Sequence, residues 1–350
     1  MSILSSRLSR VTTGIIARGL RRSFAEVHAV RDVSFEARPG RVTALVGPNG
    51  SGKTTLLLML ASLLRPDAGE IRIADVDPVA DPAGVRKILG WMPDALGAWP
   101  SLTVRETLVV TAKLYRIPAD RARDRAASLL DTVGLADLAD APARVLSRGQ
   151  KQRLGLARAL VHDPSVLLLD EPASGLDPEA RIHLRTLLRG LAADGRTILI
   201  SSHVLSELDE LADDAVFMVR GETVSGDRVA AASTRSREWR IRIAGASPDE
   251  ARQAVAGALP GAPARVDRRD IVVPFASEVD ATRALSALVA AGVAVSEFAP
   301  VTGDLEHTFL DLGSRSESGV PDPSAPASDP HTPDPGTPDP RTGTEGGDRA

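Results

Sequence analysis

One glycine-rich segment constrains the possible folds of this 350-residue chain more than any other feature. It lies between a short apolar run, Val42–Val46, and a helical pattern, Thr55–Leu64, and it fits the phosphate-loop (P-loop) pattern GxxxxGK[ST] in its strand–loop–helix setting. Glycines let backbone N–H groups converge on phosphate oxygens, and the following helix points its positive end at the same anion. A glycine-rich turn that binds nothing would need neither these flanking elements nor a Lys-Thr pair. The predicted nucleotide-binding residues are Gly47, Pro48, Asn49, Gly50, Ser51, Gly52, Lys53, Thr54 and Thr55.

The same chemistry assigns roles to four side chains. We expect Lys53 to reach the β- and γ-phosphates of ATP, and the Thr54 hydroxyl to ligate Mg²⁺. Asp170 ends the run Val166–Leu169, whose continuous apolar character is typical of a parallel strand covered on both faces. We expect Asp170 to hold Mg²⁺ directly or through water, and Glu171 to orient or deprotonate the attacking water. Two acids in a solvated loop are the alternative, which loses weight because the Mg²⁺ of a phosphate loop needs such a carboxylate.

The surrounding pattern predicts an α/β nucleotide-binding domain over residues 14–230, where short apolar strands alternate with amphipathic helices. A mostly helical stretch at about 101–146 interrupts this alternation and predicts an inserted subdomain. Its first helix is opened by a capping box formed by Thr103 and Glu106.

A second pattern follows a linker rich in small and polar residues near 230–236. The order βαββαβ over residues 237–313 predicts a small C-terminal α+β domain with the ferredoxin-like arrangement. Residues 314–350 lack aromatic side chains and repeat Asp-Pro steps, so they cannot bury enough apolar surface to offset their chain entropy. We predict a disordered Pro/Asp-rich tail there.

Composition excludes several classes of protein. The chain has no cysteine, which rules out disulfide frameworks and thiolate metal sites. Its formal net charge is −4, and three arginines against seven acids in residues 314–350 account for all of it. The remainder is neutral, which gives nucleic-acid binding little support. No apolar run reaches the length that a membrane-spanning helix needs, so a role at the membrane would require a partner.

With both nucleotide motifs placed, residues 14–230 resemble the ATP-binding cassette (ABC) family. The discriminating segment is Leu146-Ser147-Arg148-Gly149-Gln150, which is similar to the family signature LSGGQ with Arg148 in place of the first glycine. The resemblance implies that Ser147, Gly149 and Gln150 bind the ATP held by the opposite subunit of a head-to-tail dimer. Ser147 can cap a helix whose amides would face that γ-phosphate.

Four further positions are implied by the same resemblance. Asp177 closes Ser174-Gly175-Leu176-Asp177, which resembles the loop that couples the two sites of the dimer. His203 resembles the switch histidine that contacts the γ-phosphate. Phe24 falls where the family places an aromatic ring against adenine, although a phenylalanine there could instead be part of the core. Asp94 replaces a usual glutamine; its carboxylate can still meet Mg²⁺ but cannot donate an amide hydrogen bond to a membrane subunit.

These inferences predict the ATPase subunit of an ABC exporter. We expect it to form a dimer, most simply a homodimer, and to bind separate transmembrane permease subunits. It would then lie at the cytoplasmic face of the cell membrane. The segment 303–310 supports export, because it resembles the ending of many drug, antibiotic and lipid export ATPases, with Asp304 for serine and His307 for aspartate.

An importer ATPase with a ligand-sensing C-terminal domain is the alternative within transport. The C-terminal domain could equally serve only to stabilise the dimer.

Two classes outside transport fit less well. ABC proteins of DNA repair would need a coiled coil between Lys53 and Asp170, where no sustained heptads occur. ABC proteins of the ribosome carry two cassettes in one chain, whereas this chain has one. A regulator that only binds nucleotide would not need both Glu171 and His203. The cargo cannot be named from this chain, because its contacts would lie in the membrane subunits.

Overall fold

The structure, a computed structural model, describes residues 14–94, 99, 101–202, 204–233 and 236–317. Its larger part is built on a nine-stranded mixed sheet with strand order β4-β1-β2-β9-β8-β3-β7-β6-β5. The bounds of these strands are β1 Ile15–Phe24, β2 Val27–Ala37, β3 Val42–Val46, β4 Ala68–Ile73, β5 Leu89–Met92, β6 Val166–Asp170, β7 Thr197–Ser201, β8 Asp214–Val219 and β9 Glu222–Thr223.

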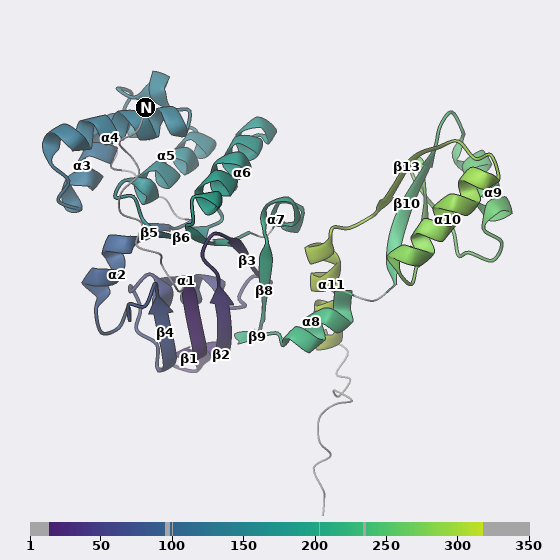
Figure 1. Cartoon of the computed structure of the whole chain (residues 1–350), viewed down its shortest axis with the longest axis horizontal. Coiled ribbons are helices and arrows are strands. Elements are labelled where there is room, and N and C mark those ends of the chain that lie inside the picture. Colours follow the sequence, from purple (N-terminus) through teal and green to yellow (C-terminus); the bar gives the residue numbers. More distant parts are fainter. Residues whose placement is uncertain (1–13, 95–98, 100, 203, 234–235, 318–350) are drawn as a thin grey trace, which may run out of the picture.

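The central strands of this sheet are parallel, with β3 between β8 and β7, and with β6 between β7 and β5. β1 pairs antiparallel with β2 on one side and with β4 on the other. This is the α/β architecture that the alternating pattern predicted, with an antiparallel edge added to a parallel core (Figure 1).

Helices cover both faces of the sheet, which explains why β6 is apolar at successive positions. Leu167 and Leu169 pack into the core formed with α5 (Arg148–Leu160), α6 (Pro178–Ala193) and the helical subdomain. Val166 and Leu168 point the other way, into the core formed with α1 (Lys53–Leu60) and the antiparallel strands. A strand buried on both faces has no position for a polar side chain until it ends at Asp170.

The predicted helical subdomain consists of α3 (Val104–Leu114), α4 (Ala119–Thr132) and two short 3₁₀ turns that lead into α5. The capping box that opens α3 is confirmed, since the Thr103 side chain accepts from the Glu106 backbone N–H and the Glu106 carboxylate accepts from the Thr103 N–H. α2 (Pro82–Ile88) precedes β5, and α7 (Leu205–Leu211) precedes β8. None of the helices in the described ranges is long and apolar enough to span a bilayer.

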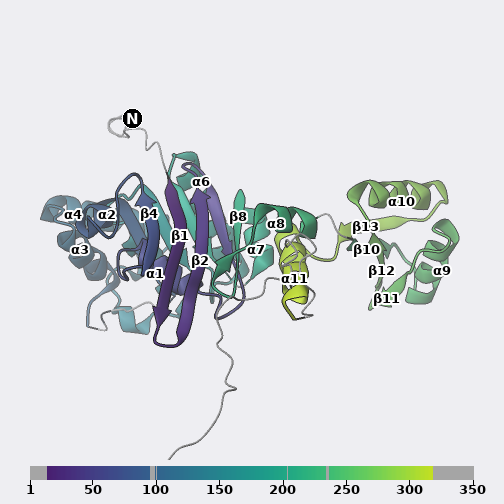
Figure 2. The same ribbon diagram turned by 90° about the horizontal axis from the view of Figure 1, so that it is seen from below.

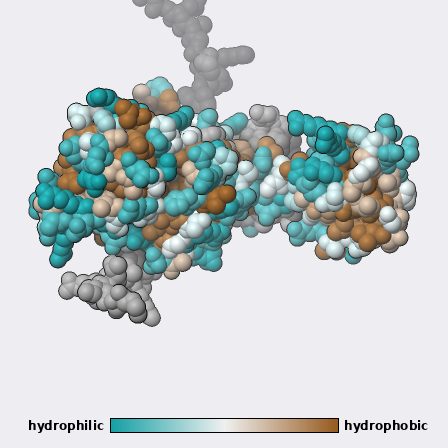
Figure 3. Space-filling model, turned by 90° about the horizontal axis from the view of Figure 1, so that it is seen from above, coloured by the Kyte–Doolittle hydropathy of each residue, from teal (hydrophilic) through white to brown (hydrophobic). Residues whose placement is uncertain are grey.

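Residues 237–300 form a second sheet with its own hydrophobic core. β10 (Arg237–Ile243), β11 (Arg265–Asp267), β12 (Asp270–Phe275) and β13 (Val295–Pro300) pair antiparallel in the order β11-β12-β10-β13. α9 (Pro248–Ala258) and α10 (Glu278–Ala290) supply Val255 and Leu288 to a core around Ile241 and Ile271. Figure 1 shows this part as a separate lobe. Hydrophobic residues lie among hydrophilic ones on the face of both lobes that Figure 3 shows.

The segment between the two lobes differs from the predicted linker. Residues 226–233 form α8 (Gly226–Ser233), because Val229 and Ala232 find apolar partners on the core of the larger sheet. Small residues are compatible with a loop or a helix, and packing decides between them.

The chain returns from the small lobe to the large one through α11 (Asp304–Glu317), which lies beside α8 and α7 (Figure 2). Leu305, Phe309 and Leu312 join the core of the larger sheet, whereas Leu310 is 55% exposed. The Leu305 N–H donates to the Asp209 carboxylate of α7 at 2.7 Å. The helix ends at Glu317, beyond the predicted start of the tail at Ser314, since the first proline comes only at Pro321. Residues 318–350 of the predicted tail lie outside the described residues.

A truncation at Thr302 should therefore destabilise the protein, whereas one at Glu317 should not. Losing the contacts of Leu305 and Phe309 should cost about 2 kcal/mol, which corresponds to a melting temperature lower by about 5 °C for a domain of this size. Scanning calorimetry of both shortened chains measures this difference. As a matched pair on one helix, Phe309→Ala should lower the melting temperature and Leu310→Ala should not. Equal melting of the two shortened chains would show that α11 has no structural part.

Candidate nucleotide-binding site

The phosphate loop runs from the end of β3 to the start of α1, as its pattern predicts. Gly52 is the residue before α1 and has φ 98°, in the left-handed region that favours glycine. A Cβ at this position would lie 2.3 Å from the backbone oxygen of Ala29, so a side chain cannot be accommodated. No side chain caps α1. The first amides of the helix are therefore available to an anion in the loop.

The Lys53 ammonium is folded back over the loop that precedes it. Its Nζ donates to the backbone oxygens of Gly47 at 2.7 Å and Pro48 at 3.1 Å. Burial lowers the pKa of Lys53, and the charges of Glu171 and Asp170 oppose that shift. A phosphate placed in the loop would add a further negative charge beside this half-buried ammonium and would favour its charged form.

Asp170 is 4% exposed and is held from two sides. Its Oδ1 accepts from Ser201 Oγ at 2.5 Å, and its Oδ2 accepts from Thr54 Oγ1 at 3.3 Å. A hydroxyl and a carboxylate, both hard oxygen donors, thus meet at the mouth of the loop and fit a Mg²⁺ ion. Within the described ranges, no three His, Cys, Asp or Glu side chains gather into a metal-holding cluster. Mg²⁺ commonly completes such a small donor set with phosphates and water.

Glu171 follows β6 with φ 53°, a left-handed conformation that is strained for a residue with a side chain. Its N–H donates to the Ser201 backbone oxygen at 3.1 Å, and its carbonyl accepts from Gln152 Nε2 at 3.1 Å. These contacts hold the strained turn in place. Neither Ser201 nor Gln152 was identified from the sequence, because nothing in the local pattern of β7 or α5 shows that they meet Glu171.

A cavity of about 600 Å³ opens in front of these groups. It brings together nine of the predicted residues, namely Asn49, Gly50, Gly52, Lys53, Thr54, Thr55, Asp94, Asp170 and Glu171. Asp94 follows β5 and is exposed on the wall of this cavity. His28 also lines it and was missed; its Nδ1 lies 2.8 Å from Ser23 Oγ. The predicted His203 lies outside the described residues.

Phe24 is not part of the core, because it is 45% exposed at the end of β1. The Arg22 guanidinium lies over the ring, 4.8 Å from its centre, and pairs with Asp67 at 2.6 Å. Phe24 does not line the cavity described above, and the guanidinium covers one face of its ring, so stacking on a base would use the opposite face.

The residues of the signature segment do not line the cavity of their own chain, except for Arg148. Ser147 caps α5 by accepting from the Gln150 N–H at 3.2 Å, and Gln150 Oε1 accepts from the Ser147 N–H at 2.9 Å. Gly149 packs against the next loop, since a Cβ on it would lie 3.0 Å from the Gly175 oxygen. Asp177 caps α6 and accepts from the Ala180 N–H at 2.8 Å.

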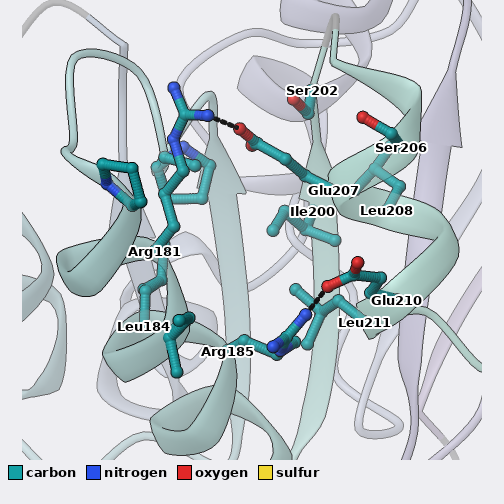
Figure 4. A pocket seen from close by; sticks show the side chains of 14 residues that line it. Arg181, Leu184, Arg185, Ile200, Ser202, Ser206, Glu207, Leu208, Glu210 and Leu211 are labelled. Atoms are coloured by element: carbon teal, nitrogen blue, oxygen red, sulfur yellow. Dashed lines mark ion pairs between the residues drawn. The ribbon is translucent and has the colours of Figure 1, made fainter. Parts of the chain in front are cut away.

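A second cavity of about 380 Å³ lies between α6 and α7 (Figure 4). Its floor is apolar, with Leu184, Ile200 and Leu208. Arg181 pairs with Glu207 at 3.0 Å and Arg185 pairs with Glu210, so the charges on its rim neutralise one another. The phosphate loop and the uncapped start of α1 lie at the first cavity and not at this one.

Comparison with known proteins agrees with this geometry. Residues 30–174 match the family model described as ABC transporter. A daunorubicin resistance ATP-binding protein of Streptomyces coeruleorubidus is 34% identical over 309 residues, which are 86% of this chain and 96% of that protein. The chain therefore belongs to the ABC transporter family.

Other relatives match a smaller share of the chain. A Nod factor export ATP-binding protein of Ralstonia nicotianae is 38% identical over 207 residues, and the match spans 64% of that protein's length. A solved ATP-binding subunit of an ABC transporter is 26% identical with a TM-score of 0.58, over 63% of this chain and 92% of that one. A bacterial ABC cassette solved as a dimer has the same fold, at 24% identity and a TM-score of 0.57 over 60% of this chain and 97% of that one.

Proposed function

We propose that this chain is the ATP-hydrolysing subunit of an ABC exporter and couples the hydrolysis of Mg-ATP to transport by separate membrane subunits. The observation that carries the proposal is the convergence of Lys53, the Thr54–Asp170 contact and Glu171 in one cavity at the carboxyl ends of the parallel strands. Ligands of open α/β sheets bind at this edge. The export direction rests on relatives named for daunorubicin resistance and Nod factor export.

The residues of the cavity divide the chemistry among them. The amides of residues 49–54 and the Lys53 ammonium bind the phosphates. Thr54 and Asp170 would hold Mg²⁺, and Asp94, which lines the same cavity, would meet it directly or through water. Bound Mg²⁺ neutralises charge that develops on the phosphate oxygens. Glu171 orients the attacking water and accepts its proton, and Phe24 stacks on the adenine. His203 contacts the γ-phosphate, as the family resemblance implies.

The complete site requires a second subunit. Ser147, Gly149 and Gln150 stand at the exposed start of α5 and are absent from the cavity of their own chain. Helix amides at that start can bind the γ-phosphate of ATP held by a second copy of this chain, packed head to tail. Asp177 lies in the loop beside that start and couples the two sites.

The membrane partner is a permease with its own spanning segments. This chain binds to it at the cytoplasmic face of the cell membrane. Exposed apolar side chains on the helical subdomain, including Leu114 and Val145, offer it a contact surface. We also propose the domain division 14–230 and 237–313, with a ferredoxin-like small domain, although α11 packs on the larger part. That contact favours a domain that stabilises the cassette over one that only senses a ligand.

Gene deletion and complementation test this function in the organism of origin. A strain without this chain should retain inside the cell a compound that the parent strain releases. The wild-type chain should restore release, and Glu171→Gln should not, because it binds ATP without turnover. Mass spectrometry of medium and cell extract measures both pools. Uptake lost in place of release would favour an importer, and unchanged pools together with wild-type ATPase activity would favour a role outside transport.

A further inference from the structure

Arg148 stands where the signature pattern of the family has a glycine, and the structure gives its side chain a defined partner. Nη2 of Arg148 donates to Ser174 Oγ at 2.6 Å. Arg148 is also the only signature residue among those lining the nucleotide cavity of its own chain. Ser174 lies in the same loop as Glu171 and follows it closely, so the contact joins the start of α5 to the loop that carries the proposed general base.

The aliphatic part of the Arg148 side chain packs against Gly175, which has no side chain. Gly175 has φ 74°, and a Cβ on it would lie 2.8 Å from Cδ of Arg148. The positive φ favours glycine at 175, and a Cβ there would displace the Arg148 side chain from its present position. Gly149, the next residue in the chain, packs on the same loop. The start of α5 and residues 174–177 consequently form one packed unit.

The same unit faces two nucleotides in the dimer proposed above. The loop after Glu171 lies at the ATP site of its own chain. The amides at the start of α5 bind the ATP that the second copy holds. With a glycine at position 148, α5 and this loop would still be joined by the Gln152–Glu171 hydrogen bond and by the packing of Gly149, but the start of α5 would lose its side-chain contact with Ser174. A guanidinium adds a charge-assisted hydrogen bond between them, of the stronger kind among hydrogen bonds.

We propose that Arg148 is a positioning residue that ties the signature helix to the loop of Glu171 through Ser174, and thereby couples turnover in the two sites of the dimer. The inference rests on the proposed composite site. The Arg148 guanidinium is engaged by Ser174 and the phosphate loop has its own lysine, so we expect ATP affinity to depend on Lys53 and the loop amides rather than on this contact.

A double-mutant cycle with Arg148→Ala and Ser174→Ala tests the tie by steady-state ATPase kinetics of the full chain. We expect each single variant to lower kcat about tenfold and to bring the Hill coefficient for ATP toward one, with KM nearly unchanged. The double variant should be no worse than either single one, because both changes remove the same contact. Arg148→Lys should restore part of the cooperativity, since its ammonium can still donate to Ser174.

Arg144→Ala is the matched control, an exposed arginine just before the signature segment, and it should behave as wild type. Additive losses in the double variant, or unchanged kcat and Hill coefficient in Arg148→Ala, would overturn the proposal. Folding of each variant is checked by its melting temperature. A failure of the proposed ATPase function, or of the proposed dimer, can be told apart from a failure of the Arg148 proposal. In that case the wild-type chain itself would hydrolyse no ATP or would not dimerise.

Discussion

Replacing Glu171 with glutamine should abolish ATP turnover and leave ATP binding intact. Glutamine keeps the size of the side chain and can adopt the same strained backbone at φ 53°, held by Ser201 and Gln152. It cannot accept a proton from water, so the rate of phosphate release should fall roughly a hundredfold or more, as expected for the loss of a general base.

Steady-state phosphate release and equilibrium binding of a fluorescent ATP analogue separate the two effects. Glu179→Gln is a suitable control, because it is an exposed acid in the first turn of α6 and should change neither quantity. Phosphate release near the wild-type rate in Glu171→Gln would remove this residue from the role of base. Loss of binding together with turnover would instead assign it to the nucleotide site as a structural carboxylate.

Mixing two inactive subunits should recover ATPase activity if each site is composite. Lys53→Ala removes the ammonium that folds over the phosphate loop, and Ser147→Arg removes the cap of α5 and blocks its exposed start. In a heterodimer of the two variants, one site carries both changes and the other carries neither. Random pairing gives about half heterodimers with one intact site each, so the mixture should reach about a quarter of the wild-type rate if that site turns over alone.

The controls for this mixing are the two mutant homodimers, which should both be inactive. Light scattering of ATP-bound Glu171→Gln provides an independent measurement, since slow hydrolysis should accumulate the closed dimer. If that protein stays strictly monomeric, with and without membranes, then Ser147 does not complete a second chain's site. An active Lys53→Ala homodimer would contradict the role of the lysine.

Much of the nucleotide site was predictable because its motifs are local. The sequence predicts a strand at Val42–Val46, a loop and a helix over Thr55–Leu64, and the structure confirms all three elements, although α1 begins at Lys53 and ends at Leu60. Continuous apolar character predicts the buried strand β6 and hence the position of Asp170 at its end. Parallel strands bring their carboxyl ends to one edge of a sheet, so separate motifs can be expected to meet there.

Other features were decided only by tertiary packing. The contact of Ser201 with Asp170 and that of Arg148 with Ser174 join residues that lie far apart in the chain, and neither residue carries a local signal for its partner. Residues 226–233 became a helix because the core of the larger sheet offered a place for Val229 and Ala232. The return of α11 onto that core likewise depends on where the small lobe ends in space. The sequence alone determined the local elements and the chemistry of the phosphate loop, since periodicity and backbone conformation act over a few residues. The tertiary structure decided which distant side chains hold Asp170, Glu171 and the signature helix in place, because only packing sets those distances.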